Sequence, residues 1–289
     1  MEIINRIPRM RSVARKLRRD GRKVGFVPTM GALHEGHLSL IRRARAMCDI
    51  VVVSIFINPI QFGRGEDFES YPRDLARDAE LVATRGVDYL FAPSIDEVYP
   101  EEFTSFVLVE ELSDKLCGVM RPGHFRGVTT VVMKLFNIIQ PDFAFFGQKD
   151  AQQGIIIKRM VHDLSLDTEI VLCPIVREPD GLAMSSRNAY LSSEERKAAV
   201  VLYRALEKSK SLYAEGERES TKILSAMRQL IEAEPLARID YVTIVDTERL
   251  EPISIISEDQ PILVALAIHI GRVRLIDNTI FNSTVFEED

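Results

Sequence analysis

A stretch at positions 28–37, with the sequence PTMGALHEGH, constrains the fold of this chain more than any other segment. It follows the apolar run at 24–27 and precedes residues 38–44, where Leu, Ile and Ala recur at the spacing of a buried helix face. The sequence therefore predicts a strand, a tight turn and a helix in succession. The two glycines of the turn allow other atoms to approach the backbone closely.

The same turn carries two histidines, His34 and His37, which are three residues apart. Residues at this spacing share one face of a helix, so both imidazoles would face the same way once the helix has begun. The N–H groups and the dipole at a helix N-terminus favour anions. These features favour a phosphate-binding turn, but an ordinary glycine-containing turn between a strand and a helix has the same pattern.

Composition limits the class of protein. The chain has 289 residues, 46% of them hydrophobic and 28% charged, which is enough for one large or two smaller cored domains. A net charge of −6 argues against nucleic acid or an acidic membrane as the main partner. Three widely spaced cysteines without a CxxC pair favour reduced thiols over a zinc site or disulfides. We expect a cytoplasmic protein, since no apolar run suits a signal peptide or a membrane span.

Alternating strand and helix patterns predict an α/β fold, with a Rossmann-like, doubly wound parallel sheet in residues 1–176. Residues 8–20 have the pattern of an amphipathic surface helix whose arginines face solvent. Residues 50–57 are apolar on both faces, as a buried parallel strand requires. Another helix should begin near Tyr71 with Pro72 just inside it. Further strands are expected at 87–92, 106–109, 143–146 and 169–176.

Beyond residue 192 the pattern changes to two amphipathic helices, at about 193–215 and 219–233. Strands of antiparallel type follow at 239–245, 262–270 and 273–276. Residues 177–289 are therefore expected to form a separate, smaller α+β domain. His269 lies within an apolar strand of this domain and is interpreted as a packed core histidine.

Polar residues follow several of the predicted strands, at the sheet edge where open α/β sheets bind ligands. Asn58 and Gln61 come directly after the strand at 50–57, and their amides can bind a small polar substrate or satisfy a local turn. Lys149 could bind phosphate, and Asp150 could cap a helix or reach a metal or ribose.

Two loops have compositions that suit phosphate. The loop at 121–127, RPGHFRG, precedes a predicted helix and could receive a polyphosphate, although its arginines could equally be solvated. The loop at 184–188, MSSRN, offers backbone N–H groups, the hydroxyls of Ser185 and Ser186, and the guanidinium of Arg187.

Six collinear motifs resemble those of the pantothenate synthetase (pantoate–β-alanine ligase) family over essentially the whole chain. They are PTMGALHEGH at 28–37, FINPIQF at 56–62, YPR at 71–73, RPGHFRGV at 121–128, FGQKDAQQ at 146–153 and MSSRN at 184–188. His34 and His37 are similar to the HIGH signature of a wider adenylyl-transferring superfamily, and the last loop stands where that superfamily carries its KMSKS loop. Gln148 departs from the pattern, because many members have Glu there.

The resemblance implies two half-reactions, with ATP as a substrate and Mg²⁺ as its metal. The pantoate carboxylate attacks the α-phosphate to give pantoyl adenylate and pyrophosphate, and β-alanine then displaces AMP to form pantothenate, the last step of its biosynthesis. The resemblance also suggests a homodimer and a smaller domain that closes over the ATP site. Metal ligands are not assigned.

The resemblance also assigns residues. Gln61, Gln153 and Asn58 would bind pantoate or β-alanine, and the catalytic groups would be those of His37, His34, Lys149, Ser185, Ser186 and Arg187. His37 is usually assigned as a proton donor, but adenylation frees no group that must be protonated, so we prefer stabilisation of phosphate charge. The residues implied to contact ATP are Met30, Gly31, Ala32, Leu33, His34, Glu35, Gly36, His37, Gly147, Gln148, Lys149, Asp150, Val176, Met184, Ser185, Ser186 and Arg187.

Two alternatives remain. One is a nucleotidyltransferase of the same superfamily with another acceptor, against which the pair Gln61 and Gln153 argues. The other is a non-catalytic nucleotide sensor or RNA-binding module that has kept the fold. The intact polar residues of every motif and the negative net charge argue against the second alternative.

Overall fold

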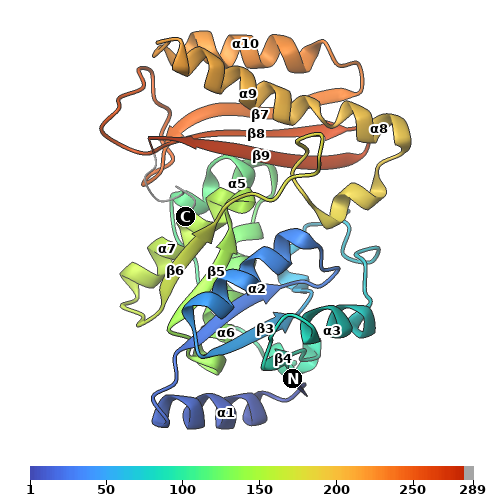
Figure 1. Cartoon of the computed structure of the whole chain (residues 1–289), viewed down its shortest axis with the longest axis vertical. Helices are drawn as coiled ribbons and strands as arrows, with labels where there is room; N and C mark the ends of the chain where they lie inside the picture. The colour runs from blue at the N-terminus through green and yellow to red at the C-terminus, as the bar shows by residue number, and fades with distance from the viewer. Residues whose placement is uncertain (283–289) are drawn as a thin grey trace. The chain divides into compact units, whose positions relative to one another are not determined.

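The computed structural model describes residues 1–282, which form two compact units (Figure 1). The N-terminal unit comprises Met1–Asp114, Arg121–Gly147 and Gln152–Cys173. The C-terminal unit comprises the described residues from Pro174 to 282, together with the short segments Lys115–Met120 and Gln148–Ala151. The predicted boundary after residue 176 differs from the observed division after Cys173, because the backbone of Val176 already pairs with that of Met184 in the C-terminal unit.

The N-terminal unit is built on a six-stranded sheet with the order β1-β4-β3-β2-β5-β6, in which every pair is parallel. From β2 the chain steps outward through β3 to β4, and then returns to the other side of β2 for β5 and β6. The sheet is therefore doubly wound, as predicted, with its switch point between β2 and β5. The strands are β1 (Glu2–Ile4), β2 (Val24–Thr29), β3 (Ile50–Ile55), β4 (Tyr89–Phe91), β5 (Phe143–Gly147) and β6 (Glu169–Cys173).

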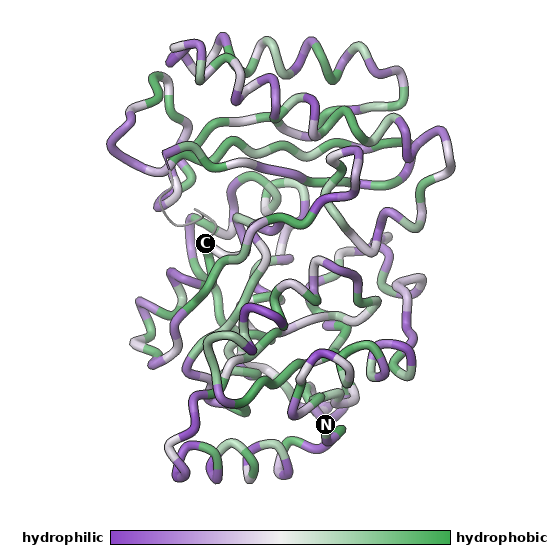
Figure 2. The backbone as a smooth tube through the Cα atoms, in the orientation of Figure 1, coloured by the Kyte–Doolittle hydropathy of each residue, from purple (hydrophilic) through white to green (hydrophobic). Residues whose placement is uncertain are grey.

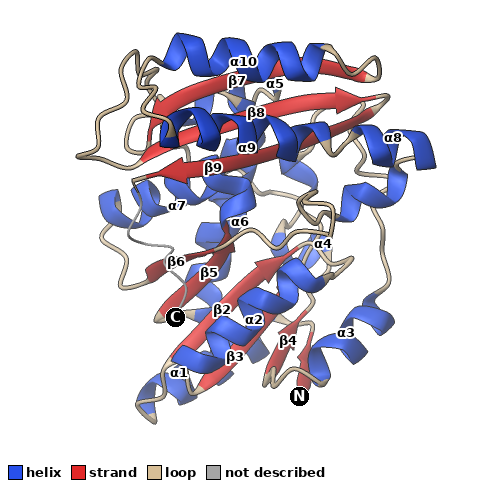
Figure 3. Cartoon of the chain, turned by 45° about the horizontal axis from the view of Figure 1, so that its top comes forward, coloured by secondary structure: helices blue, strands red, loops and turns tan. Residues whose placement is uncertain are grey.

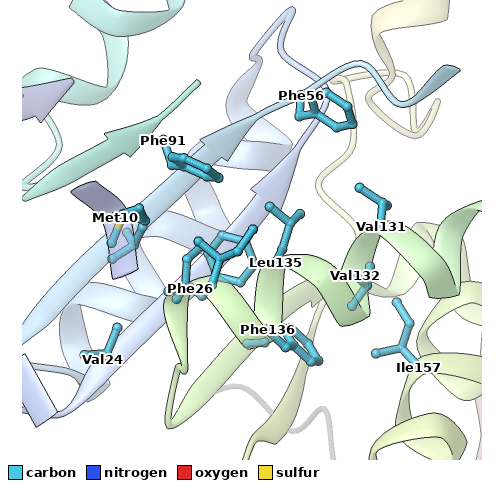
Figure 4. Packing of buried hydrophobic residues seen from close by; sticks show 14 of the residues in the cluster. Met10, Val24, Phe26, Phe56, Phe91, Val131, Val132, Leu135, Phe136 and Ile157 are labelled. Carbon is cyan, nitrogen blue, oxygen red and sulfur yellow. The ribbon is translucent and has the colours of Figure 1, made fainter. Parts of the chain in front are cut away.

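Helices cover both faces of this sheet, because alternate strand residues point to opposite faces. Phe26 and its neighbours pack with α1, α6 and α7, while Val27 and its neighbours pack with α2 and α3. Phe26 meets Phe136 edge to face, with ring centroids 6.3 Å apart (Figure 4). The helices of this unit are α1 (Ile7–Arg19), α2 (Glu35–Met47), α3 (Leu75–Ala83), α4 (Ile95–Val98), α6 (His124–Ile139) and α7 (Ala151–Asp163), the last beginning one residue before Gln152.

Two local predictions were wrong, and one short strand was missed. Residues 106–109 form no strand, because their backbone bonds to α6 side chains: Val107 N–H donates to Thr130 Oγ1 at 3.0 Å. The helix α3 begins after its cap, Asp74, which leaves Pro72 outside it. The strand β1 was not predicted, since three residues with only Ile4 buried show no periodicity.

The C-terminal unit has a three-stranded antiparallel sheet in the order β7-β8-β9, with α9 and α10 packed against it (Figure 3). The central strand β8 is almost continuously hydrophobic (Figure 2), as its burial on both faces requires. The predicted helix at 193–215 is interrupted near residues 199–200. The elements are α5 (Cys117–Met120), α8 (Ser193–Ala198), α9 (Val201–Ala214), α10 (Ser220–Glu232), β7 (Ala237–Asp246), β8 (Ile262–Ile270) and β9 (Val273–Phe281).

His269 was predicted to be a packed core histidine, but its side chain is only partly buried and lies beside charged groups. Its Nε2 lies 3.2 Å from Oδ1 of the buried Asp240, whose other oxygen accepts from Arg274 Nε at 2.7 Å. Burial lowers the pKa of His269 although Asp240 opposes the shift. The prediction failed because these charged partners lie on the neighbouring strands β7 and β9, which the local pattern does not reveal.

Candidate functional site

The turn after β2 is held in place by hydrogen bonds to a side chain of the protein itself. Gly31 and Ala32 have positive φ angles of 83° and 49°. The carboxylate of Asp78, on α3, accepts the N–H of Ala32 at 2.8 Å and the N–H of Leu33 at 2.9 Å. These two N–H groups are therefore already used, and a phosphate at this turn would have to be bound chiefly by side chains.

The two histidines cap α2 together. His34 Nδ1 accepts the N–H of Gly36 at 3.2 Å, and His37 Nδ1 accepts the N–H of His34 at 3.3 Å. The ring centroids are 4.2 Å apart, so the prediction that the imidazoles lie side by side is confirmed. Because Nδ1 is an acceptor in both rings, the proton of each neutral imidazole is assigned to Nε2. Each ring can thus act as a hydrogen-bond donor without carrying a charge.

Both polar atoms of the Asn58 side-chain amide form hydrogen bonds within the protein. The residue is only 1% exposed, and its Oδ1 accepts the hydroxyl of Tyr99 at 2.8 Å. Its Nδ2 donates to Gln61 Oε1 and to the carbonyl oxygen of Gly127, each at 3.0 Å. Burial raises the pKa of the Tyr99 phenol, so this hydroxyl remains a donor at any physiological pH. This arrangement argues against a direct substrate contact by Asn58 and makes it a positioning residue for Gln61.

The orientation of the Gln61 amide follows from that contact. Since Oε1 accepts from Asn58, the NH₂ group lies on the other side, where Nε2 is 3.0 Å from Met30 Sδ. Gln61 follows β3 in a short 3₁₀ turn (Pro59–Gln61), and Met30 follows β2. The parallel sheet thus brings Gln61, Asn58 and Met30 together, as the sequence analysis expected of strand ends.

The basic loop at residues 121–127 supports Gln61. A Cβ on Gly127 would lie 2.4 Å from the Ile60 carbonyl oxygen and 2.6 Å from Gln61 Cα, so only glycine lets α6 approach this closely. His124 Nδ1 lies 2.8 Å from the carbonyl oxygen of Gln61. The residues of this loop are therefore part of the frame of the site.

The two arginines of that loop are both engaged elsewhere. Arg121 pairs with Glu66 (Nε to Oε1 2.7 Å), and Arg126 lies 4.0 Å above the ring of Phe106. Burial alone would raise the pKa of Glu66, but the hydrogen bonds and charge of Arg121 outweigh it and lower the pKa. The sequence interpretation of this loop as a polyphosphate receptor is thus not supported.

Two further predicted residues belong to this unit. Gln153, in the first turn of α7, is half-buried, and within residues 1–282 its side chain makes no hydrogen bond to the protein. Its neighbour Gln152 is committed to the carbonyl oxygen of Leu112 at 3.1 Å. A Cβ on Gly147, at the end of β5, would meet no atom of the described residues within 4 Å. The protein itself gives no steric reason for glycine there, so the space suits close approach of a ligand.

In the C-terminal unit, the segment Gln148–Asp150 is anchored to β9. Asn278 Nδ2 donates to the carbonyl oxygens of Gln148 and Lys149 at 2.9 and 3.0 Å, and its Oδ1 accepts from Gln148 Nε2 at 3.2 Å. Gln148 therefore has a structural role, because its side chain and its backbone both bind Asn278. The ammonium group of Lys149 has only a long contact, 3.9 Å, to Asp150 within the described residues.

The serine-rich loop of the C-terminal unit closes a hairpin. Met184 N–H donates to the carbonyl oxygen of Val176 at 3.0 Å, and Ser185 Oγ accepts the N–H of Arg187 at 3.3 Å. Below the loop, Arg177 binds the buried Asp277 through two nitrogens at 2.6 and 3.0 Å. The 3₁₀ turn Ser186–Tyr190 follows. These contacts fix the hairpin whose loop carries Ser185, Ser186 and Arg187.

Sequence reasoning missed several supporting residues. Asp78 lies among the apolar positions of α3, and Asp277 and Asn278 interrupt the apolar pattern of β9. A polar residue on an otherwise buried face signals an internal hydrogen-bond partner, so these three were detectable in principle. The sequence around Tyr99 contains no such signal.

The described residues contain no group of three His, Cys, Asp or Glu side chains that could hold a metal ion. No helix among the residues that the structure describes is long and apolar enough to cross a membrane.

A doubly wound parallel sheet with a histidine pair beside its switch point and an oriented amide at the next strand defines a Rossmann-like protein with a small-ligand site. The sequence profile of the pantoate-beta-alanine ligase family matches residues 2–280. The chain therefore belongs to the pantoate–β-alanine ligase family, and it is a pantothenate-forming ligase.

Individual relatives are similar to this chain in sequence over nearly its full length. Pantothenate synthetase of Pelotomaculum thermopropionicum is 56% identical over 280 residues, covering 97% of this chain and 99% of the relative. A crystal structure of pantothenate synthetase from Thermus thermophilus is 45% identical, with a TM-score of 0.91 and coverage of 99% and 100%. The Francisella tularensis enzyme, 35% identical with a TM-score of 0.79 and coverage of 99% of both chains, was crystallised with β,γ ATP and β-alanine.

Proposed function

We propose that the chain joins pantoate to β-alanine in two steps at this site. In the first step a pantoate carboxylate oxygen attacks the α-phosphorus of ATP, and the bond from that phosphorus to the bridging oxygen breaks to release pyrophosphate. In the second step the β-alanine amine attacks the acyl carbon, AMP leaves with the bonding electrons, and the amine loses a proton. The observation that carries the proposal is the oriented NH₂ group of Gln61 beside the histidine-capped turn.

Gln61 and Gln153 bind pantoate in this proposal. Because Asn58 fixes the Gln61 amide, the group that Gln61 presents is a donor, which suits the hydroxyl and carboxylate oxygens of the acid. Uncharged donors orient a carboxylate without neutralising it, whereas a tight ion pair with lysine would weaken it as a nucleophile. An amide pair is therefore the appropriate chemistry for an acid that must attack.

The remaining motif residues bind ATP. His34 and His37 would donate from Nε2 to phosphate oxygens, and the open space at Gly147 suits close approach of the nucleotide. Lys149, with the hydroxyls and guanidinium of the 184–187 loop, would stabilise the charge that develops on the α-phosphate and on the departing pyrophosphate. This assignment extends to all the ATP-contacting residues named from the family motifs, and it includes closure of the C-terminal unit over the nucleotide.

Mg²⁺ would enter as the ATP complex. Mg²⁺ typically takes one or two carboxylates together with phosphate oxygens and water. Asp150 is half exposed and can supply one such carboxylate, whereas both carboxylate oxygens of Asp78 already accept hydrogen bonds from backbone N–H groups. Bound in this way, the ion would neutralise phosphate charge.

We further propose a cytoplasmic homodimer. The family resemblance suggests the dimer, and the exposed side chains of Phe106 and Leu108 offer an apolar surface for it. Cys48, Cys117 and Cys173 are buried and form no disulfide within residues 1–282, as suits a reducing compartment. Analytical ultracentrifugation should give twice the chain mass of 32.7 kDa, and a monomer would reject the dimer.

Isotope exchange between pyrophosphate and ATP tests the proposed reaction. Exchange should require pantoate and proceed without β-alanine, because only the first step is reversed. Exchange that requires a nucleotide or phosphopantetheine acceptor would identify the rival transferase. No exchange with any carboxylate, in a protein that still binds ATP, would favour the sensor.

A further inference from the structure

The surface between α1 and α6 carries positive charge that no acidic group balances. α1 contains six Arg or Lys residues and no acidic residue, in a chain whose net charge is −6. Ile7, Arg11 and Arg15 form one stripe of α1 at intervals of four residues, and Lys134 and Ile138 form a matching stripe on α6. These two stripes line a cavity of about 430 Å³.

The cations of this cavity have no carboxylate partner. Within residues 1–282 neither Arg11 nor Arg15 makes an ion pair, and the lining of the cavity contains no acidic residue. By contrast Arg9, on the same helix, pairs with Glu2 at 3.0 Å. Like charges four residues apart on a helix destabilise it. The pair Arg11 and Arg15 is thus an unfavourable arrangement of charge.

Lys134 is directed into the same charge cluster. Its ammonium lies 4.6 Å from the ring centroid of Phe103 and 5.5 Å from that of Tyr99, which fixes the side chain over two rings. Burial, and then the charge of Arg11, lower the pKa of Lys134. Arg11 and Lys134 therefore repel each other at the wall of one cavity, and a concave surface focuses the field of such charges.

We infer that the cavity lined by Arg11, Arg15 and Lys134 binds a small phosphate-bearing molecule. Guanidinium groups match phosphate oxygens in a two-pronged geometry, and lysine adds a point charge. Ile7 and Ile138 offer an apolar wall, and the amides of Asn137 and Gln140 offer neutral polar contacts for an organic portion. Asn137 is ten residues from Gly127 along α6, a separation of about 15 Å, so this cavity is distinct from the pantoate site.

The probe is inorganic pyrophosphate, titrated calorimetrically into three forms of the full-length protein. R11Q/R15Q removes two charges from the cavity, and K16Q/R19Q removes two charges from exposed positions of α1 that do not line it. All three proteins keep the proposed ATP site, so any binding there is common to them. The wild type and K16Q/R19Q should each show one binding event more than R11Q/R15Q, or an affinity at least tenfold higher at that site.

Three results would overturn the inference. The first is identical isotherms for the wild type and R11Q/R15Q. The second is an equal loss in both variants, which would indicate the general field of α1. The third is an unchanged isotherm with an altered oligomeric mass in R11Q/R15Q, which would show that a second protein chain meets these charges. Retained pantoate-dependent exchange in both variants would confirm that they are folded.

Discussion

The side-chain amide of Asn58 has partners on every side: the Tyr99 hydroxyl, the Gln61 side-chain carbonyl and the Gly127 backbone. A reversed Gln61 amide would place two NH₂ groups against each other and leave a buried donor unpaired, at a cost of about 1–3 kcal/mol. Asn58 and Tyr99 thus decide that Gln61 presents a donor. A residue without substrate contact can in this way determine what the site binds.

Tyr99→Phe should weaken pantoate binding. The variant removes the hydrogen bond that Asn58 Oδ1 accepts, so the Gly127 carbonyl oxygen alone is left to fix the orientation of the Asn58 and Gln61 amides. With a loss of about 1.4 kcal/mol, the KM for pantoate should rise about tenfold while kcat changes little. Steady-state kinetics with varied pantoate measure both constants.

Tyr213→Phe is the matched control, because the Tyr213 hydroxyl also bonds to an asparagine, Asn282, at 2.6 Å in the C-terminal unit. It should leave the KM for pantoate unchanged. Equal effects of the two variants, or none for Tyr99→Phe, would remove the positioning role of Tyr99.

At the scale of elements, the approach of α6 to the 3₁₀ turn after β3 depends on Gly127. The backbone of Gln61 would be only 2.6 Å from a Cβ at this position. Periodicity predicted nearly every long helix and strand, because each buries a regular face. It failed for residues 106–109 and for β1, where hydrogen bonds to distant side chains or a short length decide the structure.

Gly127→Ala should destabilise the protein and disturb the site together. Overpacking against backbone costs about 1–3 kcal/mol, so the melting temperature should fall by several degrees. Because the 3₁₀ turn must move, the KM for pantoate should rise as well. Thermal unfolding and steady-state kinetics measure the two effects.

Gly147→Ala provides the contrast, since an added Cβ there meets no atom within 4 Å in the part of the chain that the structure describes. Its melting temperature should match the wild type, while its KM for ATP should rise if the nucleotide approaches this residue. A Gly127→Ala protein as stable as Gly147→Ala would show that close packing at position 127 is unimportant.

For the whole molecule, the doubly wound topology explains how residues far apart in the chain reach one place. The strands β2 and β3 are neighbours in the sheet, so Met30 and Gln61 meet at its edge. The sequence analysis predicted this class of fold and the strand-end residues from local patterns. It could not predict that Asp78, Tyr99 and Asn278 support them, because hydrogen bonds between distant segments leave no regular spacing.

Formation of an acyl adenylate, with His37 as a hydrogen-bond donor to phosphate, is the proposed first step of the reaction. It can be tested by rapid-quench single turnover, with enzyme in excess over ATP labelled at the α-phosphate, saturating pantoate and no β-alanine. Wild type should convert the bound ATP to pantoyl adenylate. His37→Gln should keep most of that rate, and His37→Ala should be slower by about 10²–10³-fold. Absence of adenylate until β-alanine is added would contradict the two-step reaction, and a His37→Gln rate as low as that of His37→Ala would contradict the role of His37.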